Sequence, residues 1–279
     1  MLNLVRIELF KIISKPRSYL GFLAITFIIL LIQFAFYADG KEYIEFIFQS
    51  LQNSFQIEGN ILNGPLICFI ILQMLIVQMP LLVALVTGDM VSGEAASGTI
   101  RMLLSKPYSR SEILWAKYIA GSIYTFALIT WLGLLALGLG LLIFGNGDLV
   151  VLKSNELVIL RADDVIWRFL TAFFVAFLSL SVVSSFSLML SCFTDNSITP
   201  IVASMSVIIV FTIIGTLDVP IFDYIKPALF TTHMIIWRNL FDNPLFMEQI
   251  ATSMLILTIH IIVFLSIAFW HFNRKDIQH

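Results

Sequence analysis

The stretch Ser92 to Lys117 reads SGEAASGTIRMLLSKPYSRSEILWAK, and it stands between two long apolar runs. Its apolar positions, among them Ile100, Leu103 and Leu104, recur with helical spacing, and Pro107 interrupts the pattern. A connection between two membrane helices can be much shorter than these roughly 30 residues. The stretch therefore predicts an amphipathic helix, a break and the start of another helix, which together form a docking element on one side of a membrane.

The composition on either side of this stretch predicts a membrane protein. Hydrophobic residues make up 59% of the 279-residue chain and charged residues only 12%, with a mean hydropathy of +0.97. A soluble domain has about a quarter of its residues charged. Six windows lack acidic and basic residues: 19–37, 65–87, 118–144, 169–193, 200–217 and 250–270. Each is close to the roughly 17–25 residues of a spanning helix, so the predicted fold is an all-α membrane protein with six transmembrane helices in a single domain, 1–279.

The positions of lysine and arginine predict the orientation. With the N-terminus inside, the inside segments 1–18, 88–117, 194–199 and 271–279 carry ten of these residues. The outside segments are longer in total but carry six. This distribution favours both termini on the cytoplasmic side. Because no small-residue cleavage pattern follows the first window, we expect an uncleaved anchor.

The segments outside the spans have their own patterns. Residues 1–18 alternate apolar and basic side chains before Pro16, which indicates an interfacial helix on the inner leaflet, or simply a topology signal. Residues 44–55 have one apolar stripe, which predicts a helix lying on the outer surface.

The other two external segments are longer. The loop 145–168 is expected to hold a small β-hairpin, with Lys153 and Glu156 placed to pair. The segment 218–249 is too polar to cross and is expected to lie in the outer interface, or to dip in and return.

The loop also carries a family resemblance, in the residues Glu94, Gly98, Thr99, Leu103, Leu104, Pro107, Arg110 and Lys117. This pattern resembles the corresponding loop of ABC-2 type transporter permeases. The resemblance implies a cytoplasmic coupling helix between the second and third spans that inserts into a groove on an ATPase subunit. Thr99 to Ser105 would form much of that contact, with Leu103 and Leu104 as its apolar side chains. Arg101, Lys106 and Arg110 would meet acidic groups, and Glu94 would lie at the membrane boundary.

The resemblance also implies the partners. Such a permease dimerises, with a second copy or a related permease, above two ATP-binding subunits in the cytoplasmic membrane of a prokaryote. ATP and Mg²⁺ would be bound by the ATPase and no cofactor by this chain. The spacing of Gly93, Gly98 and Thr99 is only superficially that of a P-loop, because the lysine after the second glycine is missing. The net charge of −2 indicates no nucleic-acid partner.

A few polar residues inside the expected spans are candidates for a transport pathway: Gln33, Gln73, Gln78 and His260. The alternative for each is an interhelical hydrogen bond. No metal site is predicted, because His260 stands alone and Cys68 and Cys192 lie far apart inside spans. The serines of the fourth span are expected to allow close helix packing.

Two other function classes stay open. A stand-alone secondary transporter or channel would be expected to hold mid-membrane ionisable residues or broken helices in matching halves. A membrane-embedded transferase would need carboxylate or metal-ligand clusters at the interface. The transported substrate is not readable from the sequence, although few charges in the spans favour a hydrophobic or amphipathic cargo.

Overall fold

The computed structural model describes residues 1–52, 61–75, 78–99, 102, 107–152 and 157–275. Within these residues, five helices are long and apolar enough to cross a membrane, and a bent pair makes a sixth span if it is counted as one. The spans are α2 (Pro16–Gln52), α3 (Gly64–Leu75) with α4 (Gln78–Thr87), α7 (Arg110–Gly133) continued by η1 (Leu134–Leu139) and α8 (Gly140–Phe144), α9 (Ala162–Phe193), α10 (Thr199–Thr216) and α13 (Met247–Arg274). The protein is thus a predominantly helical membrane protein.

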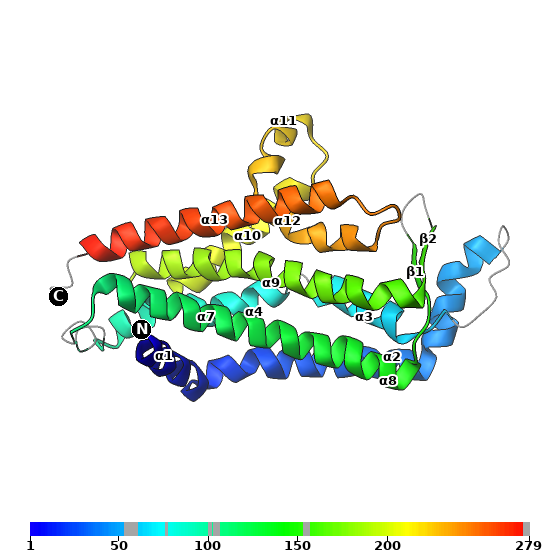
Figure 1. The fold of residues 1–279 in the computed structure, drawn as a ribbon, viewed down its shortest axis with the longest axis horizontal. Coiled ribbons are helices and arrows are strands. Elements are labelled where there is room, and N and C mark those ends of the chain that lie inside the picture. The colour runs from blue at the N-terminus through cyan, green and yellow to red at the C-terminus, as the bar shows by residue number, and fades with distance from the viewer. Residues whose placement is uncertain (53–60, 76–77, 100–101, 103–106, 153–156, 276–279) are drawn as a thin grey trace.

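The long helices run side by side along the longest axis of the molecule, and both chain ends lie at the same end of the bundle (Figure 1). This end also holds α1 (Leu2–Ser14), α5 (Ser92–Ala96) and the start of α7. The opposite end holds β1 (Leu149–Leu152) and β2 (Leu157–Leu160). The bundle therefore has two distinct ends, one with the termini and one with the hairpin.

Helix α9 lies at the centre of the bundle. Of its most apolar window, 67% is buried, against 17% for α10, and it packs against α4, α7, α10 and α13. Its serines are buried, namely Ser179, Ser181, Ser184, Ser185, Ser187 and Ser191. Small side chains let neighbouring helices approach closely. Gly121 of α7 uses this space, since a Cβ there would lie 3.3 Å from Ser184 Oγ.

The first span differs from the sequence prediction. Helix α2 continues beyond Tyr37 to Gln52, so the separate surface helix predicted for 44–55 is a continuation of α2 as far as the structure describes it. Between residues 38 and 52 the residue that weakens a helix most is Gly40, which costs about 1 kcal/mol relative to alanine. A continuing helix keeps each backbone hydrogen bond, so one such glycine does not end it.

The second span is divided, although the sequence indicated one continuous helix over 65–87. The axes of α3 and α4 differ by 57°. Pro80 lies in the first turn of α4, where backbone N–H groups have no partner within the helix. A proline at this position cannot extend the hydrogen bonding of the preceding helix, which favours a new start at α4.

The start of α3 is fixed against α8 by close backbone contact. A Cβ on Gly64 would lie 2.7 Å from the carbonyl carbon of Gly140, so only glycine fits here. Asn63 caps α3 by accepting a hydrogen bond from Leu66 N at 3.0 Å, and its amide donates to Asp148 O at 2.7 Å. These contacts tie the second span to the loop that follows the third.

Two connecting segments, 145–168 and 218–249, contain short regular elements. The strands expected in the loop 145–168 pair antiparallel, with Leu149 opposite Leu160, whereas Lys153 and Glu156 lie outside the described residues. The segment 218–249 forms four short helices, α11 (Pro220–Asp223), η2 (Lys226–Ala228), α12 (Phe230–Met234) and η3 (Ile235–Phe241). The buried rings of Phe230, Trp237 and Phe241 anchor α12 and η3, which pack against α9.

Candidate functional site: a buried ion network at the terminal end

Helix α5 is short, and α9 holds it in place. The N–H groups at a helix start lack partners within the helix. Here Ser191 Oγ of α9 accepts hydrogen bonds from Val91 N at 3.2 Å and Ser92 N at 2.9 Å. Gly93 is required beside them, because a Cβ at this position would overlap the Asp89 carboxylate. This local structure places Glu94 at a fixed point facing α1 and α7.

Four charged side chains meet there and form what we call the ion quartet: Glu8, Lys11, Glu94 and Lys117. Lys117 Nζ lies 2.9 Å from Glu8 Oε2 and 2.8 Å from Glu94 Oε2. Lys11 Nζ lies 2.6 Å from Glu8 Oε1 and 2.6 Å from Glu94 Oε1. Each carboxylate therefore bridges both lysines, and the four formal charges cancel.

Three members of the ion quartet are shielded from water, and the side chain of the fourth, Lys11, is 34% exposed. The side chain of Lys117 is 0% exposed, and those of Glu8 and Glu94 are 4% and 10% exposed. Burying ions costs several kcal/mol each, and the cost is offset only if every charge keeps its partners. Loss of one member therefore leaves an uncompensated buried charge, which typically costs about 3–5 kcal/mol.

Two members of the ion quartet, Glu94 and Lys11, have pKa values shifted in opposite directions. Burial raises the pKa of Glu94, but the charges of Lys117 and Lys11 and their hydrogen bonds outweigh it and lower the pKa overall. Burial lowers the pKa of Lys11, but hydrogen bonds to Glu8 and Glu94 outweigh it and raise the pKa overall. Both shifts favour the charged forms.

A second group of charges, the Asp89 cluster, lies beside the ion quartet. Asp89 is 2% exposed, and its two carboxylate oxygens lie 2.7 Å from Lys15 Nζ and 2.7 Å from Arg17 Nη1. Ser197 Oγ, from the turn between α9 and α10, donates a hydrogen bond to Asp89 Oδ1. The Asp89 cluster therefore joins the α1–α2 junction and the end of the second span to the turn before α10.

The start of α7 also contacts the end of the last span. Ser109 and Glu112 form a capping box, in which each side chain accepts a hydrogen bond from the other residue's backbone. Arg110 Nη1 then donates to Phe272 O at 3.2 Å, Asn273 O at 3.2 Å and Lys275 O at 2.6 Å. A cation is favourable at the C-terminus of a helix, where carbonyl groups lack partners.

The other residues of the predicted coupling pattern are more exposed. Gly98 follows α5 with a φ of +71°, a conformation that glycine adopts without strain. Thr99 Oγ1 lies 3.4 Å from Glu94 O and donates to it, and Pro107 is exposed just before the α7 cap. Four residues of the pattern lie outside the described residues: Arg101, Leu103, Leu104 and Lys106. The structure thus brings Glu94 and Lys117 together and leaves Gly98, Thr99 and Pro107 at the surface.

Comparison with known proteins places the chain in a family. Residues 26–278 match the family model described as "Protein of unknown function (DUF2705)". The chain belongs to the DUF2705 family. It is also 26% identical, over 200 residues, to the "Uncharacterized protein YhcI" of Bacillus subtilis (strain 168). That match covers 69% of this DUF2705 chain and 63% of the relative.

The pathway candidates of this DUF2705 protein do not gather in one place. Gln33 Nε2 donates to Leu135 O of the π-helix η1 at 3.0 Å. His260 Nε2 lies 3.2 Å from Ala228 O, and its Nδ1 lies 2.8 Å from Ile256 O. Gln73 is half-buried on α3 and Gln78 is exposed at the start of α4. Gln33 and His260 thus make the interhelical hydrogen bonds considered as the alternative.

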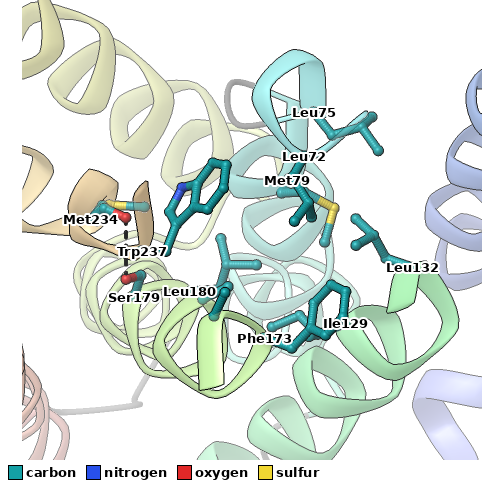
Figure 2. A pocket seen from close by; sticks show the side chains of 12 residues that line it. Leu72, Leu75, Met79, Ile129, Leu132, Phe173, Ser179, Leu180, Met234 and Trp237 are labelled. Carbon is teal, nitrogen blue, oxygen red and sulfur yellow. Dashed lines mark hydrogen bonds between the residues drawn. The ribbon is translucent and has the colours of Figure 1, made fainter. Parts of the chain in front are cut away.

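A small apolar cavity of about 60 Å³ lies inside the bundle, where α3, α4, α7, α9 and the 218–249 segment meet. Figure 2 shows Met79, Ile129, Leu132 and Trp237 around it, with Ser179 turned toward the carbonyl of Met234 at its edge. None of the four pathway candidates is among its lining residues. The cavity is an apolar packing gap rather than a polar pathway.

Sequence reasoning named Glu94 and Lys117 but missed their partners. It treated residues 1–18 as an interfacial helix in which apolar and basic side chains alternate. The structure instead buries Glu8 together with Leu4 and Ile12 and leaves Ile13 59% exposed. One signal was available: Glu8 lies on the same helical face as Leu4 and Ile12, spaced by four residues.

Proposed function

We propose that this protein is the permease subunit of an ATP-driven exporter of the ABC-2 type, coupled to a separate ATP-binding subunit. It would move substrate across the cytoplasmic membrane without doing covalent chemistry itself. The observation that carries the proposal is the ion quartet. It joins Glu94, near the start of the loop 88–117, to Lys117 at its end, and joins both to α1.

This arrangement suits a loop that transmits force. A displacement applied to the loop between Glu94 and Lys117 would move α5, the start of α7 and α1 together. Because breaking one buried ion pair costs about 3–5 kcal/mol, the ion quartet would pass the displacement on rather than absorb it. A partner that favours one position of the loop would then bias the helices between inward and outward states.

The neighbouring contacts extend the same link to other spans. The Asp89 cluster reaches Ser197 before α10, and Arg110 holds the end of α13. A movement at α5 and α7 would therefore reach the second, fifth and sixth spans. We assign the terminal end to the cytoplasm, where α1 would act as an interfacial elbow helix and Thr99 to Ser105 as the coupling helix.

The partners follow from this assignment. ATP and Mg²⁺ would be bound by the ATPase subunit, since this sequence lacks the P-loop lysine. Six helices enclose little space, so a second permease, identical or related, would complete the exit path within the lipid bilayer. An exporter built this way needs two coupling loops that approach each other when the ATPase dimer closes.

Co-purification tests the proposal. The chain is purified from its native host together with any ATP-binding subunit that it retains, and the Leu103→Ala/Leu104→Ala variant is compared with wild type. Truncating a buried leucine removes about 1.5–3 kcal/mol of apolar contact, so association should weaken roughly 10-fold or more. Arg101→Glu should act in the same direction by reversing a charge at the rim of the contact. The matched control is Leu142→Ala, at the opposite end of the bundle and 82% exposed.

The outcome separates the function classes. Loss of the ATPase from the double variant, with membrane insertion intact and Leu142→Ala unaffected, supports the coupling role. Full ATPase association of the double variant would show that this loop is not the coupling element. Substrate transport by the purified chain alone, in vesicles without ATP, would favour the stand-alone transporter instead.

A further inference from the structure

A larger cavity opens between α10 and the 218–249 segment. Its volume is about 340 Å³, which lies within the range of small-molecule sites, about 300–1,000 Å³. One wall is the apolar face of α10, with Met205, Ile208 and Ile213. The opposite wall comes from α12, which packs beside α10, and from η3, which follows α12. The cavity is thus apolar along one side and receives its polar groups from the other.

Arg238 of η3 supplies the charge of this cavity. Within the described part of the chain, its guanidinium forms no ion pair or hydrogen bond, and its Nε is buried without an acceptor. The guanidinium carbon of Arg238 lies 6.0 Å from the centroid of the Trp237 ring. Burial lowers the pKa of Arg238, so the surroundings penalise its charge without compensating it. A half-buried arginine in this state favours an anion beside it.

Two threonines of α12 add unpartnered hydroxyl groups. Thr231 is 7% exposed, and the Oγ1 atoms of Thr231 and Thr232 are buried without a hydrogen-bond partner in the structure. Threonines on the facing helix behave differently: Thr212 donates to Ile208 O and Thr216 to Ile213 O within α10. Buried hydroxyl groups normally find a partner. Three unsatisfied groups therefore line one cavity.

We propose that this cavity binds an anionic lipid, with its phosphate on Arg238, Thr231 and Thr232 and an acyl chain along α10. A phosphate accepts hydrogen bonds from a guanidinium and from hydroxyl groups at the same time. The apolar wall favours a lipid over a free phosphate ion, and α10 is the least buried span, so its face is open to a bilayer. The site is independent of the exporter role, because it uses none of the coupling residues.

Lipid binding to the purified full-length protein tests this site. Native mass spectrometry and thermal stability are measured with phosphatidylglycerol, with zwitterionic phosphatidylcholine and with inorganic phosphate. Arg238→Gln should reduce phosphatidylglycerol binding roughly 10-fold or more, the size expected for one charged hydrogen-bonded contact. Thr231→Val/Thr232→Val should weaken it less. Ile213→Trp should block the acyl chain and leave the charge in place.

Arg161→Gln is the matched control, because Arg161 is exposed ahead of α9 and outside the cavity. Arg238→Lys keeps the positive charge and should bind phosphatidylglycerol with intermediate affinity. Such partial binding would show that the loss in Arg238→Gln does not come from misfolding. Equal losses from Arg238→Gln and Arg161→Gln, or equal binding of the two phospholipids, would overturn the proposal. Phosphate binding that Ile213→Trp leaves unchanged would instead assign the site to a free anion. A change in dimer content of Arg238→Gln with unaltered lipid binding would assign this face to a second copy.

Discussion

Lys117 holds its ammonium group between two carboxylates with none of its side chain exposed to solvent. Burial of an ammonium group costs several kcal/mol unless charged partners replace the lost water. Glu8 and Glu94 supply the compensation, from chain positions 109 residues before and 23 residues before Lys117. Lys117 therefore links three segments of the chain, namely α1, α5 and α7.

We expect Lys117→Met to lower the free energy of unfolding by about 3–5 kcal/mol, since Glu8 and Glu94 would then share Lys11 alone. Thermal unfolding in detergent measures the effect. Lys226→Met is the control, because Lys226 pairs with the exposed Asp223 and such pairs contribute about 1 kcal/mol or less. The double variant Glu8→Gln/Lys117→Met removes a positive and a negative charge together, so it should cost less than the sum of the single variants. Strict additivity would contradict a coupled network.

The pKa shifts of Glu94 and Lys11 predict how the stabilising effect of the ion quartet depends on pH. The pKa of Glu94 is lowered, so its stabilising contribution is complete above the ordinary glutamate range near 4 and is lost as pH falls through the folded value. The pKa of Lys11 is raised, so its contribution is complete below about 10.4 and is lost as pH rises through the folded value.

We therefore expect the stability difference between wild type and Glu94→Gln to stay flat from roughly pH 5.5 to 9.5. It should shrink below about pH 4, where wild-type Glu94 itself becomes neutral. Melting temperatures of both proteins across this range provide the measurement. A difference that changes steeply near pH 7 would show that the carboxylate titrates at neutral pH, as a proton-coupled carrier would need.

At the scale of elements, apolar windows locate the spans because hydrocarbon length is a property of the local sequence. Four of the six windows fall wholly within helical stretches, 200–217 ends one residue beyond α10, and 65–87 covers the two helices α3 and α4. The ends are less predictable: α2 continues to Gln52 because nothing stops it, and α4 starts anew near Pro80. One divided span alone is not the pair of matching broken helices expected of a secondary transporter. The contact of Gly64 with Gly140 joins segments that are distant in the sequence. The apolar windows 65–87 and 118–144 do not indicate it.

That contact gives a prediction for the element it fixes. We expect Gly64→Ala to destabilise the protein by about 1–3 kcal/mol, because the new Cβ would press on the backbone of Gly140 and Leu141. Gly138→Ala, in the π-helix η1, meets no atom within 4 Å and should be neutral, or stabilising by up to about 1 kcal/mol. Thermal unfolding of both variants in one detergent decides the point. Equal effects would mean that α3 and α8 do not approach this closely.

At the scale of the whole molecule, both chain ends, α1 and α5 lie at one end of the bundle, opposite the hairpin (Figure 1). The six expected spans, an even number, indicated that both termini lie at one end, whereas the cytoplasmic side assigned from the ten-to-six distribution of basic residues stays a prediction. It could not indicate the ion quartet, because each charged residue by itself has the pattern of a solvated surface. Pairing over 83 to 109 residues depends on how the helices pack, which periodicity does not report.

The orientation of the bundle can be tested with two matched asparagines. Asn196 lies in the turn between α9 and α10, and Asn146 lies before β1. Both side chains are exposed, and each accepts one hydrogen bond from a nearby backbone N–H group. With the terminal end in the cytoplasm, a membrane-impermeant thiol reagent should label Asn146→Cys in intact cells and should label Asn196→Cys only after the membrane is opened. The native Cys68 and Cys192 are buried, so background labelling should be low. Labelling of Asn196→Cys in intact cells would place the terminal end outside, where no ATPase could reach the loop, and would end the exporter proposal at the same time.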